Sequence, residues 1–240
     1  AQALDGELAK ADLQPGARVR AACAAARRRG PSDRGLLADL EPLKNQMVNI
    51  PGHLSAELLT TTAQARSWEL DPEGALADLH QALAFSPRPE TACRARLLRA
   101  RLLSTTDPMV GWYEALRTVE VARDHGLLRY EVLAWGLVGE SMVMLGRTQE
   151  AIERLRSGVA RLLAHGETRA ASEVRLHLGM VLRAAGRLPD AHKALLGAMD
   201  GRPPPYGTLS LGAKTQTAIL AALDSDAATI WDYAPSSKSW

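Results

Sequence analysis

Apolar and small residues recur along the chain with the period of an α-helix, most regularly between residues 127 and 200. One face of the first predicted helix carries residues at offsets 0, 3, 4 and 7: Trp135, Val138, Gly139 and Met142. Gly146 follows this face directly, and glycine in that place is typical of a helix C-terminus. The pattern predicts a helix over 129–145, a turn at Gly146, and a second helix over 148–164 with Thr148 as its N-cap.

The same arrangement returns 40 positions later. Matched small residues lie at that spacing: Gly139 and Gly179, Gly146 and Gly186, Ala151 and Ala191. A fixed period of this size is typical of a helical-repeat array. The sequence therefore predicts two clear copies of a helix–turn–helix unit over 127–200.

Glycine inside the first helix of each copy predicts a close contact between paired helices. Glycine in a helix interior costs about 1 kcal/mol relative to alanine, so a compensating use is expected. We expect Gly139 to let Ala151 and Leu155 of the second helix approach its backbone. In the next copy, Gly179 is expected to face Ala191 and Leu195.

The order of these residues resembles the tetratricopeptide repeat. The first copy of the motif comprises Trp135, Val138, Gly139, Met142, Gly146, Ala151 and Leu155. The second comprises Leu178, Gly179, Leu182, Gly186, Ala191, Leu195 and Ala198. The common repeat has about 34 residues, so a longer-helix variety is indicated. The resemblance implies an all-α, right-handed superhelix of antiparallel helix hairpins that serves as a protein-interaction scaffold without catalysis of its own.

The rest of the chain is predicted to extend one helical-repeat domain over residues 1–240. Its predicted parts are N-terminal degenerate helices over 15–52, two degenerate hairpins over 53–126, the two clear repeats over 127–200, and C-terminal capping helices over 206–233. Asp71-Pro72 and Asp107-Pro108 are expected to open helices, each with aspartate as N-cap and proline in the first turn.

Composition and charge narrow the function classes. Hydrophobic residues make up 46% of the 240 positions and aromatic residues 4%, and the net charge is +2. A charge so close to balance does not predict nucleic-acid binding. Two cysteines, Cys23 and Cys93, form no metal or disulfide pattern, which favours a reduced, cytoplasmic setting. No apolar run reaches the roughly 20 residues that span a membrane, so no membrane association is expected.

No catalytic, nucleotide-binding or metal-binding motif is apparent in the sequence, so we expect neither enzyme activity, cofactor nor metal. His125 and His165 are predicted at helix ends, where a histidine interacts favourably with the helix dipole. His177 and His192 lie on facing predicted helices but lack a third zinc ligand. Four arginines on one predicted helix are interpreted as solvated flanks of a leucine row: Arg94, Arg96, Arg99 and Arg101.

The inner surface of the repeats is the candidate binding site. Stacking of hairpins places the first helices along a concave groove. The residues expected there are Leu133, Glu140, Val143 and Met144 in the first clear repeat and Glu173, Leu176, Met180 and Arg183 in the second. This mainly apolar set with a charged rim suits a peptide or a helix of a partner protein. Two alternatives remain open: the chain's own last helices fill the groove, or these residues pack against the neighbouring unit.

A different class of function also fits the sequence. The chain begins at Ala1 rather than Met, which suits a sensor or regulatory module cut from a larger bacterial signalling or transcription-control protein. Self-association is a further interpretation, because five tryptophans and an end helix are available for a homodimer.

Overall fold

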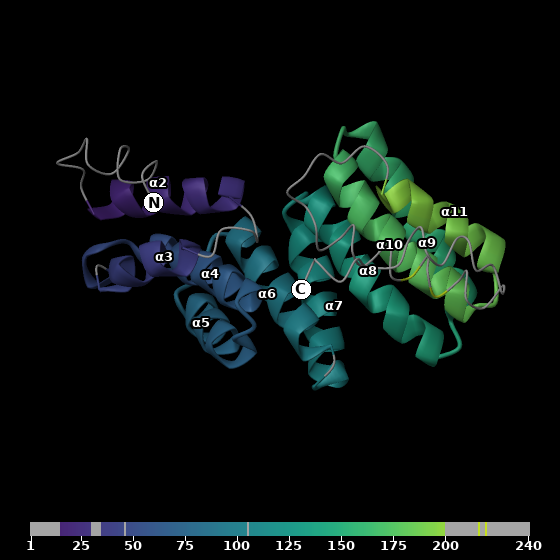
Figure 1. Ribbon diagram of the computed structural model, residues 1–240, viewed down its shortest axis with the longest axis horizontal. Coiled ribbons are helices and arrows are strands. Elements are labelled where there is room, and N and C mark those ends of the chain that lie inside the picture. The colour runs from purple at the N-terminus through teal and green to yellow at the C-terminus, as the bar shows by residue number, and fades with distance from the viewer. Residues whose placement is uncertain are drawn as a thin grey trace. The chain divides into compact units, whose positions relative to one another are not determined.

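The computed structural model describes residues 15–29, 35–45, 47–104 and 106–199, together with Gln216 and Ile219. Every regular element in these ranges is a helix, which confirms the predicted all-α fold (Figure 1). The chain divides into two compact units, Ala1–His125 (unit 1) and Gly126–Trp240 (unit 2). The extent of a single domain stays a prediction, and the capping helices expected over 206–233 lie outside the described residues except for Gln216 and Ile219, which are helical.

Unit 1 consists of two hairpins preceded by shorter elements. Its helices are α2 (Pro15–Arg29), α3 (Leu36–Lys44), a short 3₁₀ turn (Met47–Asn49), α4 (Gly52–Trp68), α5 (Pro72–Ala84), α6 (Pro89–Leu103) and α7 (Pro108–Asp124). Helices α4 and α5 form one hairpin, and α6 and α7 form the next. Helices α2 and α3 pack on α4 and enclose a core centred on Leu40, Leu54 and Leu58.

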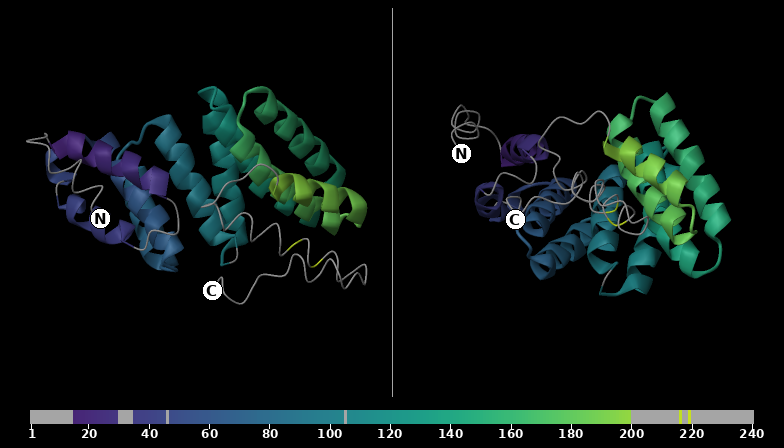
Figure 2. Two further views of the ribbon diagram at one scale, coloured as in Figure 1. Left: turned by 45° about the horizontal axis from the view of Figure 1, so that its top comes forward. Right: turned by 45° about the vertical axis from the view of Figure 1, so that its right-hand side comes forward.

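Unit 2 contains the two clear repeats. Its helices are α8 (Leu128–Met144), α9 (Thr148–Ala164), α10 (Thr168–Ala184) and α11 (Leu188–Met199). The first two match the predicted spans to within one residue. Helix α10 packs against α8, α9 and α11 together, and Figure 2 shows these four helices, teal to yellow-green, from two further directions.

Three glycines end helices of unit 2 in the left-handed region: Gly146 (φ 73°), Gly166 (φ 73°) and Gly186 (φ 72°). At the first of these, Arg147 N–H donates to Met142 O at 2.9 Å and Gly146 N–H donates to Val143 O at 3.0 Å. This pair of bonds is a Schellman motif, which satisfies carbonyls that a helix end leaves free. The same two bonds recur at the other two glycines, so the predicted stop signals are confirmed.

The predicted N-cap of α9 was wrong by one residue. Arg147 is the N-cap, Thr148 is the first helical residue, and no side chain caps this end. Arg147 N–H still bonds back to Met142 O as part of the Schellman motif that ends α8. The next helix therefore starts one residue later, at Thr148.

Small residues bring paired helices together in unit 2 as expected. A Cβ placed on Gly139 would lie 3.1 Å from Leu155 Cδ1, and one on Gly179 would lie 2.6 Å from Leu195 Cγ. Both leucines are fully buried. The use predicted for the two helical glycines is therefore confirmed.

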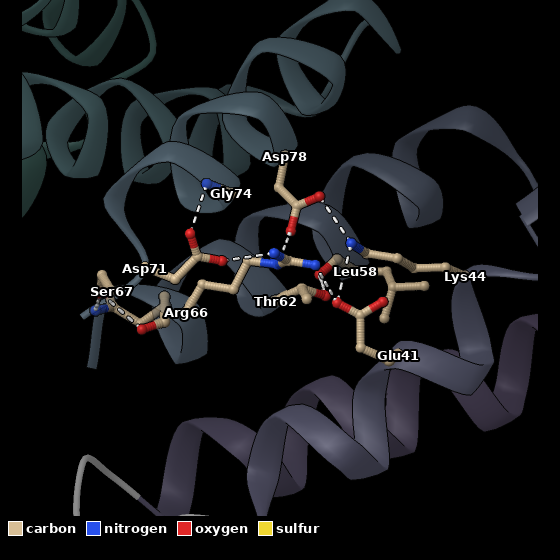
Figure 3. Close-up of polar contacts among 10 residues, drawn as sticks. Glu41, Lys44, Leu58, Thr62, Arg66, Ser67, Asp71, Gly74 and Asp78 are labelled. Carbon is tan, nitrogen blue, oxygen red and sulfur yellow. Dashed lines mark hydrogen bonds and ion pairs between the residues drawn. The ribbon is translucent and has the colours of Figure 1, made fainter. Parts of the chain in front are cut away.

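Unit 1 combines buried apolar clusters with ion pairs among α3, α4 and α5 (Figure 3). Arg66 of α4 pairs with Glu41 at 2.5 Å, with Asp71 at 2.6 Å and with Asp78 at 3.1 Å. Lys44 of α3 reaches the other oxygen of Asp78 at 2.8 Å. Asp78 is buried, so both of its oxygens depend on these cations for compensation.

The two predicted aspartate caps are confirmed. Asp71 accepts a hydrogen bond from Gly74 N–H at 2.9 Å, and Asp107 accepts one from Val110 N–H at 3.2 Å. The Gly74 N–H, followed by the Arg66 guanidinium, holds the pKa of Asp71 below its ordinary value. The carboxylate of Asp71 thus stabilises both its own helix start and the ion-pair group.

The arginines of α6 correct the interpretation of solvated flanks. Arg96 and Arg99 both donate to Glu114 of α7, at 2.8 Å and 3.2 Å. Glu114 is only 5% exposed, so this carboxylate lies inside the α6–α7 contact. Two of the four arginines are therefore partly buried partners of a buried acid, because the facing helix supplies a charge that the sequence of α6 alone does not reveal.

Candidate functional site: the inner face of helices α8 and α10

The packing of unit 2 defines which side of the repeats is the inner one. Helices α8 and α10 lie against each other, whereas α9 and α11 have no comparable contact. In a superhelix of hairpins, the helices that contact each other directly form the inner, concave layer, and the helices that are held apart form the outer layer. We call the sides of α8 and α10 that are turned away from α9 and α11 the inner face.

The predicted binding residues differ in exposure. Leu133 is 5% exposed and belongs to the packed interior. Met144 is 88% exposed at the C-terminal end of α8. Six residues are partly exposed: Glu140, Val143, Glu173, Leu176, Met180 and Arg183.

The structure joins one of these residues to a histidine on the neighbouring helix. His177 Nδ1 of α10 lies 2.6 Å from Glu140 Oε1 of α8. The His177 side chain is 11% exposed, whereas that of Glu140 is 40% exposed. The buried imidazole of His177 therefore links α10 to α8, while the carboxylate of Glu140 stays accessible to solvent.

Glycine makes room for this link. A Cβ on Gly136 would lie 2.7 Å from His177 Cδ2, so only glycine admits the ring at this point. The sequence indicated that His177 faces His192 and that Glu140 lies in the groove, but not that His177 pairs with Glu140. The signal that could have found the pair is Gly136, a second glycine inside α8 that no contact within its own hairpin explains.

Among the described residues, no partner is found for the charge of Arg183 on the inner face. No hydrogen bond or ion pair to its guanidinium is found in the described part of the chain, and its Nε is buried without a partner. Its neighbours on α10 and beyond are satisfied: Arg175 donates to Gly197 O at 2.9 Å, and Arg187 pairs with Asp190. A half-buried cation without a partner is costly, and an anion from a ligand would offset that cost.

The two histidines predicted at helix ends, His125 and His165, lie there. His125 and His165 are the C-caps of α7 and α9, and the His165 ring lies 2.8 Å from Arg161 O. Among the described residues, no three histidines, cysteines or acids are grouped so that they could hold a metal ion.

The two cysteines are poor candidates for chemistry. Burial raises the pKa of both Cys23 and Cys93 to about 11. A thiol with such a pKa stays protonated near neutral pH and is a poor nucleophile. Their role is that of small apolar core residues.

Within the described ranges, every helix is too short or too polar to cross a lipid bilayer.

Comparison with known proteins identifies the fold. No protein-family model matches the sequence, and no curated protein matches it. NprR in complex with its cognate peptide NprX is similar in structure, with a TM-score of 0.71 and 13% identity over 97% of this chain and 69% of that one. The apo form of the quorum sensor NprR from B. thuringiensis gives a TM-score of 0.62 and 13% identity, covering 97% of this chain and 67% of its own.

A kinesin light chain type of protein from Podosopora anserina, with nearly identical TPR-like repeats, gives a TM-score of 0.57 and 16% identity over 78% of this chain and 94% of that one. At such low identity the likeness concerns the fold alone. The geometry of the hairpins and these neighbours together show that the chain is built as a TPR-like helical-repeat α-solenoid.

Proposed function

We propose that the chain is a non-catalytic interaction module whose inner face in unit 2 binds a peptide or a helix of a partner protein. The contact residues are the seven accessible ones from the predicted set: Glu140, Val143, Met144, Glu173, Leu176, Met180 and Arg183. Leu133 supports the face from inside. The observation that carries the proposal is the partly exposed Leu176 and Met180 beside Arg183, whose guanidinium has no partner in the described residues.

Several features support this function. Methionine side chains adapt to irregular partners, and partly exposed apolar residues beside charge suit a peptide. The Glu140–His177 link holds α8 and α10 in one arrangement, so the face is formed before a ligand arrives. NprR, which has the same fold, has been captured with its cognate peptide.

A substitution on the inner face tests the proposal. The purified full chain is incubated with a synthetic library of 12-residue peptides on beads, and binding is compared between the natural sequence and Met180→Glu. The new charge replaces an apolar contact and should reduce peptide binding at least tenfold, a loss of about 1.4 kcal/mol or more. The matched control is Leu163→Glu, the same kind of change at an exposed leucine of α9 outside the inner face.

The melting temperature of each variant separates binding from folding. Met180 is partly exposed, so its replacement should leave the melting temperature within about 2 °C of the natural sequence. Equal peptide binding by the natural sequence, Met180→Glu and Leu163→Glu would show that the inner face is not the site.

A sensor or regulatory role is the second candidate. The observation in its favour is that nearly the whole chain aligns with 69% of the length of NprR in its peptide complex. In this role a cytoplasmic peptide or protein partner, rather than nucleic acid, is the ligand, and its binding shifts an equilibrium between states. Light scattering with and without a selected peptide distinguishes a monomeric sensor from a homodimer.

A further inference from the structure

Helix α7 of unit 1 has two sides of different character. One side packs against α6: a Cβ on Gly111 would lie 3.0 Å from Ala100 O, and Glu114 accepts hydrogen bonds from two arginines of α6. Among the described helices, α6 is the one with which α7 makes an extensive contact. The opposite side of α7 has no comparable helix partner in the described part of the chain.

Large apolar side chains follow one another along that opposite side. Met109, Trp112, Tyr113 and Leu116 lie at offsets 0, 3, 4 and 7, which is one face of a helix. Met109 is 70% exposed and Tyr113 is 56% exposed, while Trp112 and Leu116 are partly exposed. We call these four residues the α7 apolar face. Apolar residues that gather on one exposed surface, rather than lying scattered, are typical of an interaction site.

The spacing of the α7 apolar face makes it self-complementary. Offsets of 0, 3, 4 and 7 read the same from either end. In an antiparallel pair of α7 helices with a two-fold axis between Trp112 and Tyr113, Met109 of one copy is level with Leu116 of the other. Trp112 is then level with Tyr113 of the other copy, and aromatic rings pair favourably when offset or edge to face. A patch that binds a second copy of itself produces a closed dimer.

The charges beyond the apolar face favour the same arrangement. Arg117 and Glu120 form a surface ion pair at 2.8 Å. In the antiparallel pair, Arg117 of one copy is level with Pro108 of the other, next to the N-cap Asp107. The guanidinium therefore meets a carboxylate, and Glu120 meets the positive end of a helix dipole. A parallel pair would instead bring Arg117 beside Arg117 of the other copy.

The size of the α7 apolar face limits the affinity. A standard interface buries roughly 800 Å² on each partner. An aromatic side chain covers at most roughly 150–250 Å², and all four residues are already partly covered. The contact is therefore smaller than a standard interface, and its dissociation constant should be roughly 10–100 μM.

We propose that two copies of this chain associate through α7, antiparallel about a two-fold axis between Trp112 and Tyr113. The contact uses unit 1 alone and shares no residue with the inner face of unit 2. It therefore stands or falls separately from the function proposed above, and Met180→Glu should leave the dimer unchanged.

Sedimentation velocity of the full chain measures the association, at concentrations from one tenth to ten times the expected dissociation constant. The natural sequence should shift from monomer to dimer mass over this range. Met109→Glu should weaken the dimer at least tenfold, because the contact would bury a carboxylate without a partner. The matched control is Val48→Glu, the same kind of change at a 93% exposed residue elsewhere in unit 1, which should leave the dimer unchanged.

Cysteine cross-linking tests the geometry. Tyr113→Cys places a thiol beside the two-fold axis, roughly 1.5 Å along the helix from its counterpart, whereas Glu120→Cys places one roughly 22 Å from its counterpart. Diamide, which takes two electrons and two protons from a pair of thiols, should therefore join Tyr113→Cys into a covalent dimer and leave Glu120→Cys monomeric. The natural Cys23 and Cys93 are fully buried and should not compete.

The dimer would be disproved by a monomer mass at every concentration, or by a dimer that Met109→Glu does not weaken. Cross-linking of Glu120→Cys without cross-linking of Tyr113→Cys would overturn the antiparallel arrangement. Circular dichroism of each variant checks its folding, and Met109→Glu should remain folded because an acid in the first turn suits the helix dipole. Were it to unfold, the Tyr113→Cys result would decide alone.

Discussion

In unit 2, Gly139 and Gly179 let the second helix of each hairpin reach the backbone of the first, and apolar side chains fill the contact. In unit 1, the hairpin of α6 and α7 also has a close approach at Gly111, where a Cβ would lie 3.0 Å from Ala100 O, and it adds the carboxylate of Glu114 between Arg96 and Arg99. The hairpin of α4 and α5 likewise depends on ion pairs around Arg66 (Figure 3). The same helix-hairpin geometry is thus stabilised by close packing at glycines in unit 2 and additionally by ion pairs in unit 1.

The difference explains why only one half of the chain carries a visible repeat. Close packing needs a small residue at one fixed position, which leaves the same letter at the same spacing in each copy. An ion pair can be placed wherever two long side chains meet, so it leaves no common pattern. Replacing the Glu114 carboxylate in unit 1 and replacing the helical glycines of unit 2 should therefore change the free energy of unfolding by different amounts.

The largest effect is expected from Glu114→Ala in unit 1. This change leaves Arg96 and Arg99 without their acid inside the α6–α7 contact. Breaking a buried pair usually costs 3–5 kcal/mol, and the two arginine side chains are 25% and 27% exposed, so we expect about 2–3 kcal/mol. Urea denaturation followed by circular dichroism measures the loss.

Glu120→Ala in the same helix is the control. Within the described ranges its carboxylate pairs with Arg117 on the surface, with side chains 59% and 47% exposed, so the cost should be below about 0.5 kcal/mol. Equal losses for the two variants would mean that the Glu114 group is no more than a surface ion pair.

A medium effect is expected from Gly179→Ala in unit 2. The new Cβ would lie 2.6 Å from Leu195 Cγ, the branch point of a fully buried side chain that has little room to move. Overpacking costs about 1–3 kcal/mol, and alanine returns about 1 kcal/mol of helix propensity, so a net loss of up to about 2 kcal/mol is predicted.

Gly139→Ala sharpens that test. There the nearest atom is a terminal methyl of Leu155 at 3.1 Å, which can shift by a few tenths of an ångström. We expect the unfolding free energy to stay within about 0.5 kcal/mol of the natural sequence or to rise slightly. A larger loss for Gly139→Ala than for Gly179→Ala, measured by the same denaturation, would contradict the contact geometry.

A gain in stability, smaller than the loss expected for Glu114→Ala, is expected from Leu70→Gly. Leu70 ends α4 with φ 62° and is 87% exposed, taking the place that glycine has at the helix ends of unit 2. Relief of the left-handed strain should stabilise unit 1 by about 1 kcal/mol. The reverse change, Gly146→Ala, should lower the stability of unit 2 by a similar amount in thermal melts; no change in either direction would show that these positions are not strained.

The sequence predicted the elements whose signals are local. Asp71 and Asp107 as caps, the span of α9 and the glycine stops of unit 2 each depend on residues within one turn of one another. The contacts of Gly139 and Gly179 within their hairpins were also accessible, because a glycine at matched places inside two helices indicated a close approach of the paired helix.

What the sequence did not predict depends on the register between helices. Glu140 and His177 are 37 positions apart and meet only because α8 and α10 lie against each other at one particular level. Glu114 meets Arg96 and Arg99 for the same reason. The left-handed Leu70 was missed because leucine gives no turn signal, although its φ is that of a glycine.

The most direct test of the central claim, that the inner face of unit 2 is the binding site, is hydrogen–deuterium exchange of the full chain with and without a peptide selected from the bead library. The account predicts slower exchange at the C-terminal half of α8 and along α10 from Glu173 to Arg183, with little change in α9 or unit 1. Protection confined to unit 1 or to α9 would contradict it.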